Sequence, residues 1–232
     1  MNSAVVIKPI STMETYVKAT FYSTYALLFT TGTVTFIEAL RTDIPEVRHI
    51  MNLETCISLV AGFYYSYFTQ QVKESSDKNV PLDYKEINTI RYSDWMITTP
   101  LMILVLCATL AYNKKMPVHL LTYFILVVLD LGMVGLGYLG ETKVLSRNIA
   151  LITSFMCFFL MFGLIAYIYF QGKSPLFNYI LFGAFFIIWG IYGVIYNIDE
   201  EKKNIIFNIL DAIAKSIMGI CLWAYFTKIV VI

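Results

Sequence analysis

Long apolar stretches separated by short polar segments constrain the fold of this chain more than any other feature of its sequence. An α-helix needs about 20 predominantly apolar residues to cross the hydrocarbon core of a membrane. Seven stretches of this kind follow one another: residues 14–40, 47–71, 89–112, 117–139, 146–170, 176–197 and 204–230. Proline, glycine and charged residues lie between them, as is typical of helix ends. The sequence therefore predicts an all-α membrane protein, a bundle of seven transmembrane helices.

The composition agrees with this class and argues against others. Hydrophobic residues make up 58% of the 232 residues and charged residues 14%, and the mean hydropathy is +0.68, which is too apolar for a soluble domain of this length. A formal net charge of +1 gives no indication of a nucleic-acid partner. The four cysteines, Cys56, Cys107, Cys157 and Cys221, lie far apart within apolar stretches, so we expect buried free thiols and no metal site. We expect one domain over residues 1–232.

Lys215 is an ionisable residue in the middle of the last apolar stretch. A charged side chain at the bilayer centre costs from about 3 to more than 10 kcal/mol, so such residues are interpreted as functional. Asp211 precedes Lys215 by four residues, a spacing that puts both side chains on one helix face. An amine kept away from water can lose its proton and form a Schiff base with an aldehyde. A structural ion pair is the alternative.

A second polar group opens the third stretch. Arg91, Asp94 and Thr98 recur at spacings of three and four, so they line one helix face. Glu54 and Asp130 add two carboxyl groups at membrane depth, and with the pair in the last stretch they bring the ionisable groups to six. So many charges are costly for an ion-pair network that only joins helices. We therefore expect the bundle to enclose a charged functional site.

These motifs resemble those of the microbial rhodopsins, seven-helix proteins that bind retinal. The resemblance covers the whole chain and rests on Arg91-Tyr92-Ser93-Asp94-Trp95, on Thr98-Thr99-Pro100-Leu101, and on Asp211 four residues before Lys215. It implies that all-trans retinal is the cofactor, bound to Lys215 as a Schiff base. It also implies that Asp94 and Asp211 are the counter-ions, that Asp94 is the first proton acceptor, and that both are supported by Arg91, Thr98 and Tyr65.

The same resemblance implies the walls of a retinal pocket and an orientation. Trp95 and Trp189 would enclose the polyene from two sides, and Thr99 would form a hydrogen bond with Asp130. The other pocket residues that it implies are Met102, Met133, Gly137, Ser154, Phe158, Tyr192 and Tyr196. The N-terminus of the family lies outside the membrane, whereas the loop charges of this chain leave the orientation unsettled.

One position departs from the proton-pump pattern of that family. Val105 lies three turns beyond Asp94, where pumps usually have an Asp or Glu that returns a proton to the Schiff base, and valine cannot donate one. Glu54, with Asn208 as a polar partner, and the hydroxyl-rich first stretch resemble the ion path of channelrhodopsins. For the threonines of the first stretch, hydrogen bonds back to carbonyl groups of their own helix are the alternative.

A light-gated cation channel is therefore the favoured hypothesis, and the compact chain also resembles rhodopsins of large algal viruses. An outward proton pump with a weak proton donor and a sensory rhodopsin stay open as alternatives. We do not expect an enzyme, because the sequence has no catalytic set outside the retinal site. The expected partners are retinal, membrane lipids and translocated protons or small cations, and assembly as a homo-oligomer stays open.

Overall fold

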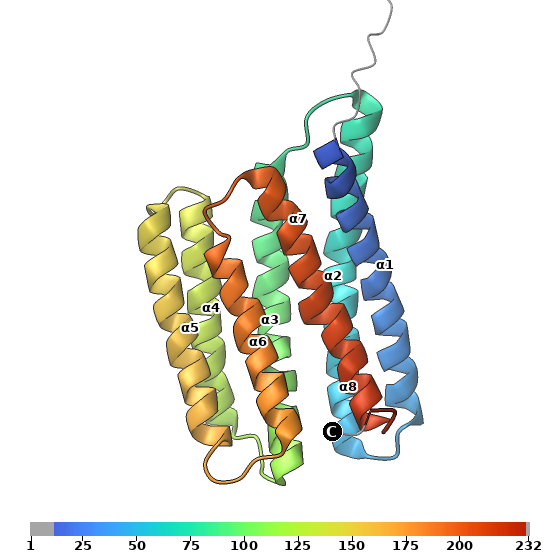
Figure 1. The fold of residues 1–232 in the computed structure, drawn as a ribbon, viewed down its shortest axis with the longest axis vertical. Helices are drawn as coiled ribbons and strands as arrows, with labels where there is room; N and C mark the ends of the chain where they lie inside the picture. The colour runs from blue at the N-terminus through green and yellow to red at the C-terminus, as the bar shows by residue number, and fades with distance from the viewer. Residues whose placement is uncertain (1–11, 231–232) are drawn as a thin grey trace, which may run out of the picture.

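The computed structural model describes residues 12–230, which form a bundle of seven long helices (Figure 1). The first six are α1 (Thr12–Arg41), α2 (Pro45–Lys78), α3 (Tyr84–Lys114), α4 (Leu120–Glu141), α5 (Arg147–Tyr169) and α6 (Leu176–Val194). The seventh is continuous but consists of α7 (Glu200–Asp211), the π-helix η1 (Ala212–Ile217) and α8 (Met218–Phe226). No strand occurs within residues 12–230. The predicted all-α, seven-helix fold is confirmed.

The helix ends differ from the predicted spans where polar side chains stabilise them. α2 continues past residue 71 to Lys78, whose ammonium pairs with Glu74 at 2.9 Å one turn earlier. α3 begins before residue 89 because the Asp83 side chain caps it, accepting a hydrogen bond from the Glu86 backbone N–H at 3.0 Å. The predicted single domain extends over residues 1–11 and 231–232, which lie outside the described residues, so that assignment stays a prediction.

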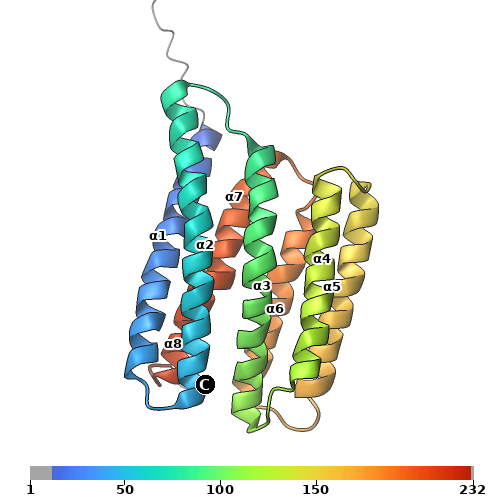
Figure 2. The ribbon, with the colours of Figure 1, turned by 180° about the vertical axis from the view of Figure 1, so that it is seen from behind.

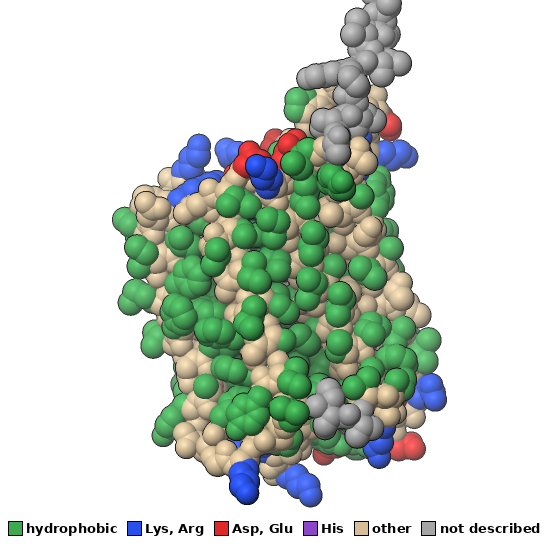
Figure 3. All heavy atoms as spheres, viewed as in Figure 1, with side chains coloured by type: hydrophobic (Ala, Val, Ile, Leu, Met, Phe, Trp, Pro, Cys, Tyr) green, Lys and Arg blue, Asp and Glu red, His purple; other side chains and the backbone are tan. Residues whose placement is uncertain are grey.

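The surface of the bundle is that of a membrane protein. Five helices are long and apolar enough to cross a membrane, namely α3, α4, α5, α6 and the seventh helix, whereas α1 and α2 carry more polar residues. Hydrophobic side chains cover the middle of the face shown in Figure 3, and lysine and arginine side chains gather at its two ends. This banding matches a hydrocarbon layer between two aqueous phases. The expectation that all four cysteines are buried is wrong, because Cys56 and Cys221 are exposed on the surface of the bundle.

The order of the helices around the bundle determines which side chains can meet. α1 packs beside α2, and α4 packs beside α5, at opposite ends of the bundle in both views (Figures 1 and 2). α3 lies between these pairs, with α6 and the seventh helix across from it. The polar face of α3 is therefore directed toward the middle of the seventh helix, which contains Lys215.

Candidate functional site

Lys215 lies in the π-helical segment of the seventh helix and is 2% exposed. The sequence predicted an unbroken α-helix here, because a π-helix has no local sequence signature comparable to a proline. Thr31 on α1 donates a hydrogen bond to the Ser216 carbonyl at 3.3 Å, which ties the widened segment to a neighbouring helix. π-Helical turns are rare and recur at functional sites.

Two buried carboxylates face the Lys215 amine. Its Nζ donates to Asp94 Oδ2 at 2.6 Å, and Asp211 Oδ1 lies 3.7 Å away. Thr98 donates to the Asp94 carbonyl at 2.9 Å and lies 3.4 Å from its Oδ1. The structure thus brings together the amine and both of the counter-ions that the sequence predicted.

Arg91 balances the second carboxylate. Its guanidinium donates to Asp211 Oδ2 at 2.9 Å and to the Tyr65 hydroxyl at 2.9 Å. Tyr65 in turn donates to Asp211 at 2.8 Å, and Tyr192 and Trp95 donate to the other carboxylate oxygen at 2.7 and 3.2 Å. Two cations and two carboxylates therefore neutralise one another, as buried charges require.

A cavity of about 110 Å³ adjoins Lys215. One water molecule needs roughly 10–15 Å³ measured in this way, so the cavity can hold an organic group. The predicted residues on its wall are Trp95, Thr99, Met102, Met133, Gly137, Ser154, Phe158, Trp189, Tyr192 and Tyr196. Unpredicted wall residues are Tyr92, Val134, Leu151, Phe155, Gly193, Phe207 and Ala214.

Some of these unpredicted residues follow from contacts between helices. Gly193 lies so close to α5 that an added Cβ atom would meet the Phe155 ring at 2.5 Å, and nothing in either local sequence indicates that approach. The place of Tyr92 on the wall could have been expected, because Tyr92 lies two residues before Asp94 in the same motif.

Asp130 is an exception among the predicted pocket residues. It is fully buried but lies behind the wall, where its Oδ2 accepts a hydrogen bond from Thr99 at 2.7 Å. This contact between α3 and α4 is the one that the sequence predicted. Asp130 therefore supports the cavity wall without lining it.

The structure separates Glu54 from Asn208, and the predicted partnership of these two residues is wrong. Asn208 accepts a hydrogen bond from Arg91 at 2.8 Å and donates one to Thr20 at 3.1 Å. Glu54 lies against Gly219, where an added Cβ atom would be 2.8 Å from its Oε2. Asn208 precedes Lys215 along the seventh helix and Gly219 follows it, so the two polar groups lie on opposite sides of the amine.

The threonines of α1 divide into two groups. The exposed Thr30 and Thr33 donate back to carbonyls of their own helix at 2.9 and 2.8 Å, as the alternative interpretation expected. The buried Thr24 and Thr31 instead donate to backbone carbonyls of the seventh helix at 2.9 and 3.3 Å. Thr24 and Thr31 thus join α1 to the helix that carries Lys215, whereas the buried Thr35 donates back to the Thr31 carbonyl at 3.0 Å and pairs with Thr55 on α2 at 2.9 Å.

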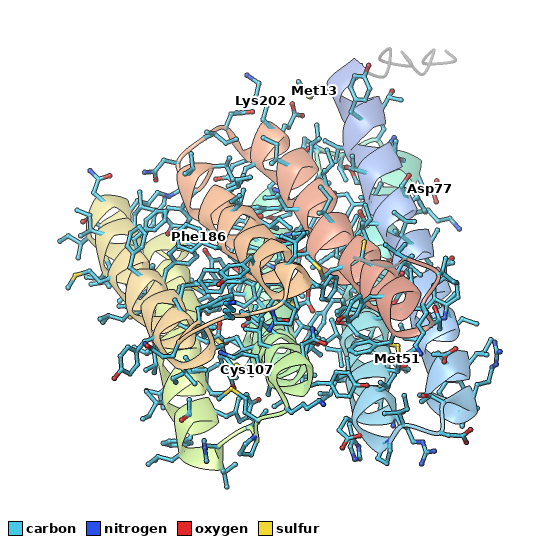
Figure 4. All side chains as sticks on the ribbon, turned by 60° about the horizontal axis from the view of Figure 1, so that its bottom comes forward. Met13, Met51, Asp77, Cys107, Phe186 and Lys202 are labelled. Atoms are coloured by element: carbon cyan, nitrogen blue, oxygen red, sulfur yellow. The ribbon has the colours of Figure 1, made fainter. Side chains whose placement is uncertain are left out.

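A second charged cluster, which the sequence analysis missed, lies near the start of the seventh helix. Lys203 is 0% exposed and donates to Glu141 at 3.2 Å and to Glu200 at 2.9 Å. Arg147 pairs with Glu200 at 3.2 Å. The neighbouring Lys202 is exposed at the end of the bundle (Figure 4). The sequence shows two adjacent lysines in a polar segment, and only the ion pairs that Lys203 forms with Glu141 at the end of α4 and with Glu200 distinguish it from Lys202.

This cluster is connected to the Lys215 site. Asn204 accepts a hydrogen bond from Arg91 at 3.2 Å and donates one to Asn88 at 3.1 Å. Asn88 in turn donates to Glu141 and Glu200 at 3.2 and 2.7 Å. A continuous hydrogen-bonded network therefore extends from the counter-ions to the end of the bundle at which the seventh helix begins.

Comparison with known proteins decides the family. The chain matches the family model for bacteriorhodopsin-like proteins over residues 16–229. It belongs to this family. The structure resembles that of viral rhodopsin OLPVRII with a TM-score of 0.86 and 40% sequence identity, over 93% of this chain and 99% of that chain. No curated protein matches the chain.

More distant solved structures share the fold of this rhodopsin. The blue light-absorbing proteorhodopsin from Med12 is 20% identical with a TM-score of 0.70, over 92% of this chain and 98% of that chain. Xanthorhodopsin, described as a light-driven ion pump with dual chromophore, is 19% identical with a TM-score of 0.74, over 91% of this chain and 92% of that chain.

The rhodopsin family binds retinal and in general transports ions in response to light. The residues of this chain fit such a group. A buried amine lines an aromatic and apolar cavity, and two carboxylates next to that amine can balance a cation on its nitrogen.

Proposed function

We propose that this rhodopsin binds all-trans retinal through Lys215 and moves protons, when illuminated, toward the side of the membrane on which its N-terminus lies. The observation that carries this proposal is the placement of two carboxyl groups on opposite sides of Lys215. Asp94 lies on the side of the Arg91 network, and Glu54 lies beside Gly219 on the other side. With the N-terminus outside, as the family resemblance implies, transport is outward.

Asp94 is better suited than Asp211 to receive a proton from Lys215. Asp211 already accepts hydrogen bonds from four side chains, namely Tyr65, Arg91, Trp95 and Tyr192. Among the described residues, Asp94 accepts hydrogen bonds only from Lys215 and Thr98, and it is the nearer carboxylate, at 2.6 Å. Retinal bound to Lys215 supplies light absorption and the displacement that starts transfer. The proton on Nζ then passes to Asp94 Oδ2.

Glu54 is suited to return a proton to Lys215. Its side chain is 3% exposed, and it forms no hydrogen bond or ion pair within residues 12–230. An ionised carboxylate without a partner is very costly in such surroundings, so Glu54 holds a proton in the resting protein. The donor position that Val105 lacks on α3 is thereby replaced from α2.

The hydrogen-bonded network that extends from Arg91 to the start of the seventh helix favours the transport of protons over that of larger cations. The charged side chains of this network all form ion pairs, namely those of Arg91, Glu141, Arg147, Glu200 and Lys203. The Lys203 side chain has no exposed surface. A cation that crossed the bundle would have to break several of these pairs, whereas a proton can pass along hydrogen bonds. The light-gated channel is the second candidate, because the buried Thr31 hydroxyl of α1 meets the seventh helix at Ser216, and Thr31 and Glu54 both lie against Gly219.

Voltage-clamp recording under illumination distinguishes these functions. Each unit charge gains about 2.3 kcal/mol per 100 mV of membrane potential, so a channel current must reverse where the ion gradients dictate. We expect a current that keeps one sign at all ordinary voltages. Glu54→Gln should reduce this current, because it slows the return of the proton to Lys215. A current that reverses with the cation gradients would overturn the pump in favour of the channel. No current, with an intact visible band, would favour a sensory rhodopsin.

A further inference from the structure

Two buried serine hydroxyls lie on the Glu54 side of Lys215. Ser58 is one turn after Glu54 on the same face of α2, and Ser216 directly follows Lys215 in the π-helix. Each is 1% exposed, and neither side-chain oxygen has a hydrogen-bond partner within residues 12–230. Most buried hydroxyls in proteins have a partner, so two without one at this place require an explanation.

Close helix packing brings these groups together. An added Cβ atom at Gly219 would lie 2.8 Å from Glu54 Oε2 and 2.8 Å from the Thr31 methyl group, so only glycine allows this approach. Gly32 likewise leaves an added Cβ only 3.3 Å from the Ser58 Cβ. Thr31 donates to the Ser216 carbonyl at 3.3 Å. α1, α2 and the seventh helix thus converge on one small polar region.

Glu54 does not reach Lys215 directly. Its carboxyl group lies at Gly219, four residues after Lys215, and four residues correspond to about 6 Å along a helix. A proton that travels this distance needs an intermediate carrier. Buried waters occupy sites lined by polar groups that otherwise have no partner. Ser58, one turn after Glu54, and Ser216, next to Lys215, provide two such groups.

We propose that Ser58 and Ser216 hold water that connects the Glu54 carboxyl group to Lys215 Nζ, so that both serines are positioning residues for the return of the proton. This inference rests on the proposed role of Glu54. The O–H bond of Glu54 breaks and its proton passes to a water oxygen, while the water chain gives a different proton to Nζ. The water is unchanged, Glu54 is left as a carboxylate, and it regains a proton from the aqueous phase on its own side.

Flash spectroscopy of the retinal-bound protein tests this role. In Ser58→Ala and Ser216→Ala we expect the return of the proton to slow about tenfold, the effect of one lost hydrogen bond on a barrier. Transfer to Asp94 and the absorption maximum should stay as in the wild type. Thr55→Val is the matched control: Thr55 is buried next to Glu54, but its hydroxyl is paired with Met51 and Thr35 at 2.8 and 2.9 Å.

Infrared spectroscopy in the dark supplies a measurement that does not depend on turnover. The carbonyl band of protonated Glu54, identified by its loss in Glu54→Gln, should move in Ser58→Ala toward the frequency of a carboxyl group without a hydrogen bond. Wild-type return rates and an unshifted band in both serine variants would overturn the relay. If proton return is slow in Glu54→Gln but not in the serine variants, the serine relay is wrong and the donor role of Glu54 stands. If Glu54→Gln is as fast as the wild type, the donor role of Glu54 fails, and the relay fails with it.

Discussion

At the residue scale, two carboxylates around one amine have different tasks because their hydrogen-bond partners differ. Asp211 is held by an arginine, two tyrosines and a tryptophan, whereas Asp94 has the lysine and one threonine. A carboxylate that accepts many donors is stabilised as an anion. Asp211 is therefore a fixed charge, and Asp94 is the group that can change its protonation.

Lys215→Ala should abolish the visible absorption band that forms when retinal is added, because no other amine within residues 12–230 adjoins the cavity. Absorption spectroscopy after purification with retinal measures this. Lys202→Met is the matched control, since it removes an exposed lysine that does not line the cavity and should keep the band. A chromophore that borohydride still reduces onto the Lys215→Ala protein would contradict the assignment.

Asp94→Asn removes the negative charge 2.6 Å from Lys215 Nζ while leaving the Asp211 cluster intact. With less negative charge next to the cation, the absorption band should move to longer wavelength, and light-driven proton transfer should be lost. Steady-state and flash spectroscopy measure the two effects. An unchanged spectrum together with unchanged transfer would assign the acceptor role to Asp211 instead.

At the scale of elements, the seventh helix is shaped by its neighbours. It widens into a π-helix at Lys215 and passes α1 and α2 at Gly219 with no space for a Cβ atom. Both features bring its backbone close to the buried hydroxyls of α1 and to Glu54. Interhelical contact at small residues is common in membrane bundles, since it lets backbones approach closely.

Gly219→Ala should therefore destabilise the protein by about 1–3 kcal/mol, the usual cost of overpacking, and should slow proton return by displacing Glu54. Gly163→Ala on α5 is the matched control, because an added Cβ there would meet no atom within 4 Å. Thermal unfolding with flash spectroscopy measures both effects. If the two alanine variants behave alike, Glu54 is not held in place by close packing against Gly219.

At the scale of the whole molecule, charge pairs close the end of the bundle at which the seventh helix begins. Lys203 joins the end of α4 to the seventh helix, and Arg147 at the start of α5 adds a second cation. These contacts link elements that are far apart in the sequence. They help to hold the seventh helix next to α3, whose Arg91 and Asp94 side chains contact Asp211 and Lys215.

Lys203→Met should lower the free energy of unfolding by about 3 kcal/mol or more, because it leaves Glu141 and Glu200 buried or half-buried with a weaker partner. Lys202→Met, next to it but exposed, should change the stability by less than about 0.5 kcal/mol. Thermal or denaturant unfolding of the two variants measures the difference. Equal stabilities would show that the Lys203 pairs contribute nothing net.

The sequence by itself determined the seven helices, the amine and its two carboxylates, and most of the cavity wall. The helices and their polar faces follow from local patterns, because apolar length sets the membrane spans and spacings of three and four set which residues share a helix face. The counter-ion roles and the wall residues were implied by the resemblance of the motifs to those of microbial rhodopsins. Only the tertiary structure decided that Lys203 is buried while Lys202 is exposed, that Asn208 joins Arg91 and not Glu54, and that Lys215 lies in a π-helix. Such facts depend on the rotation and axial position of each helix relative to its neighbours, and the pattern within one helix does not contain them.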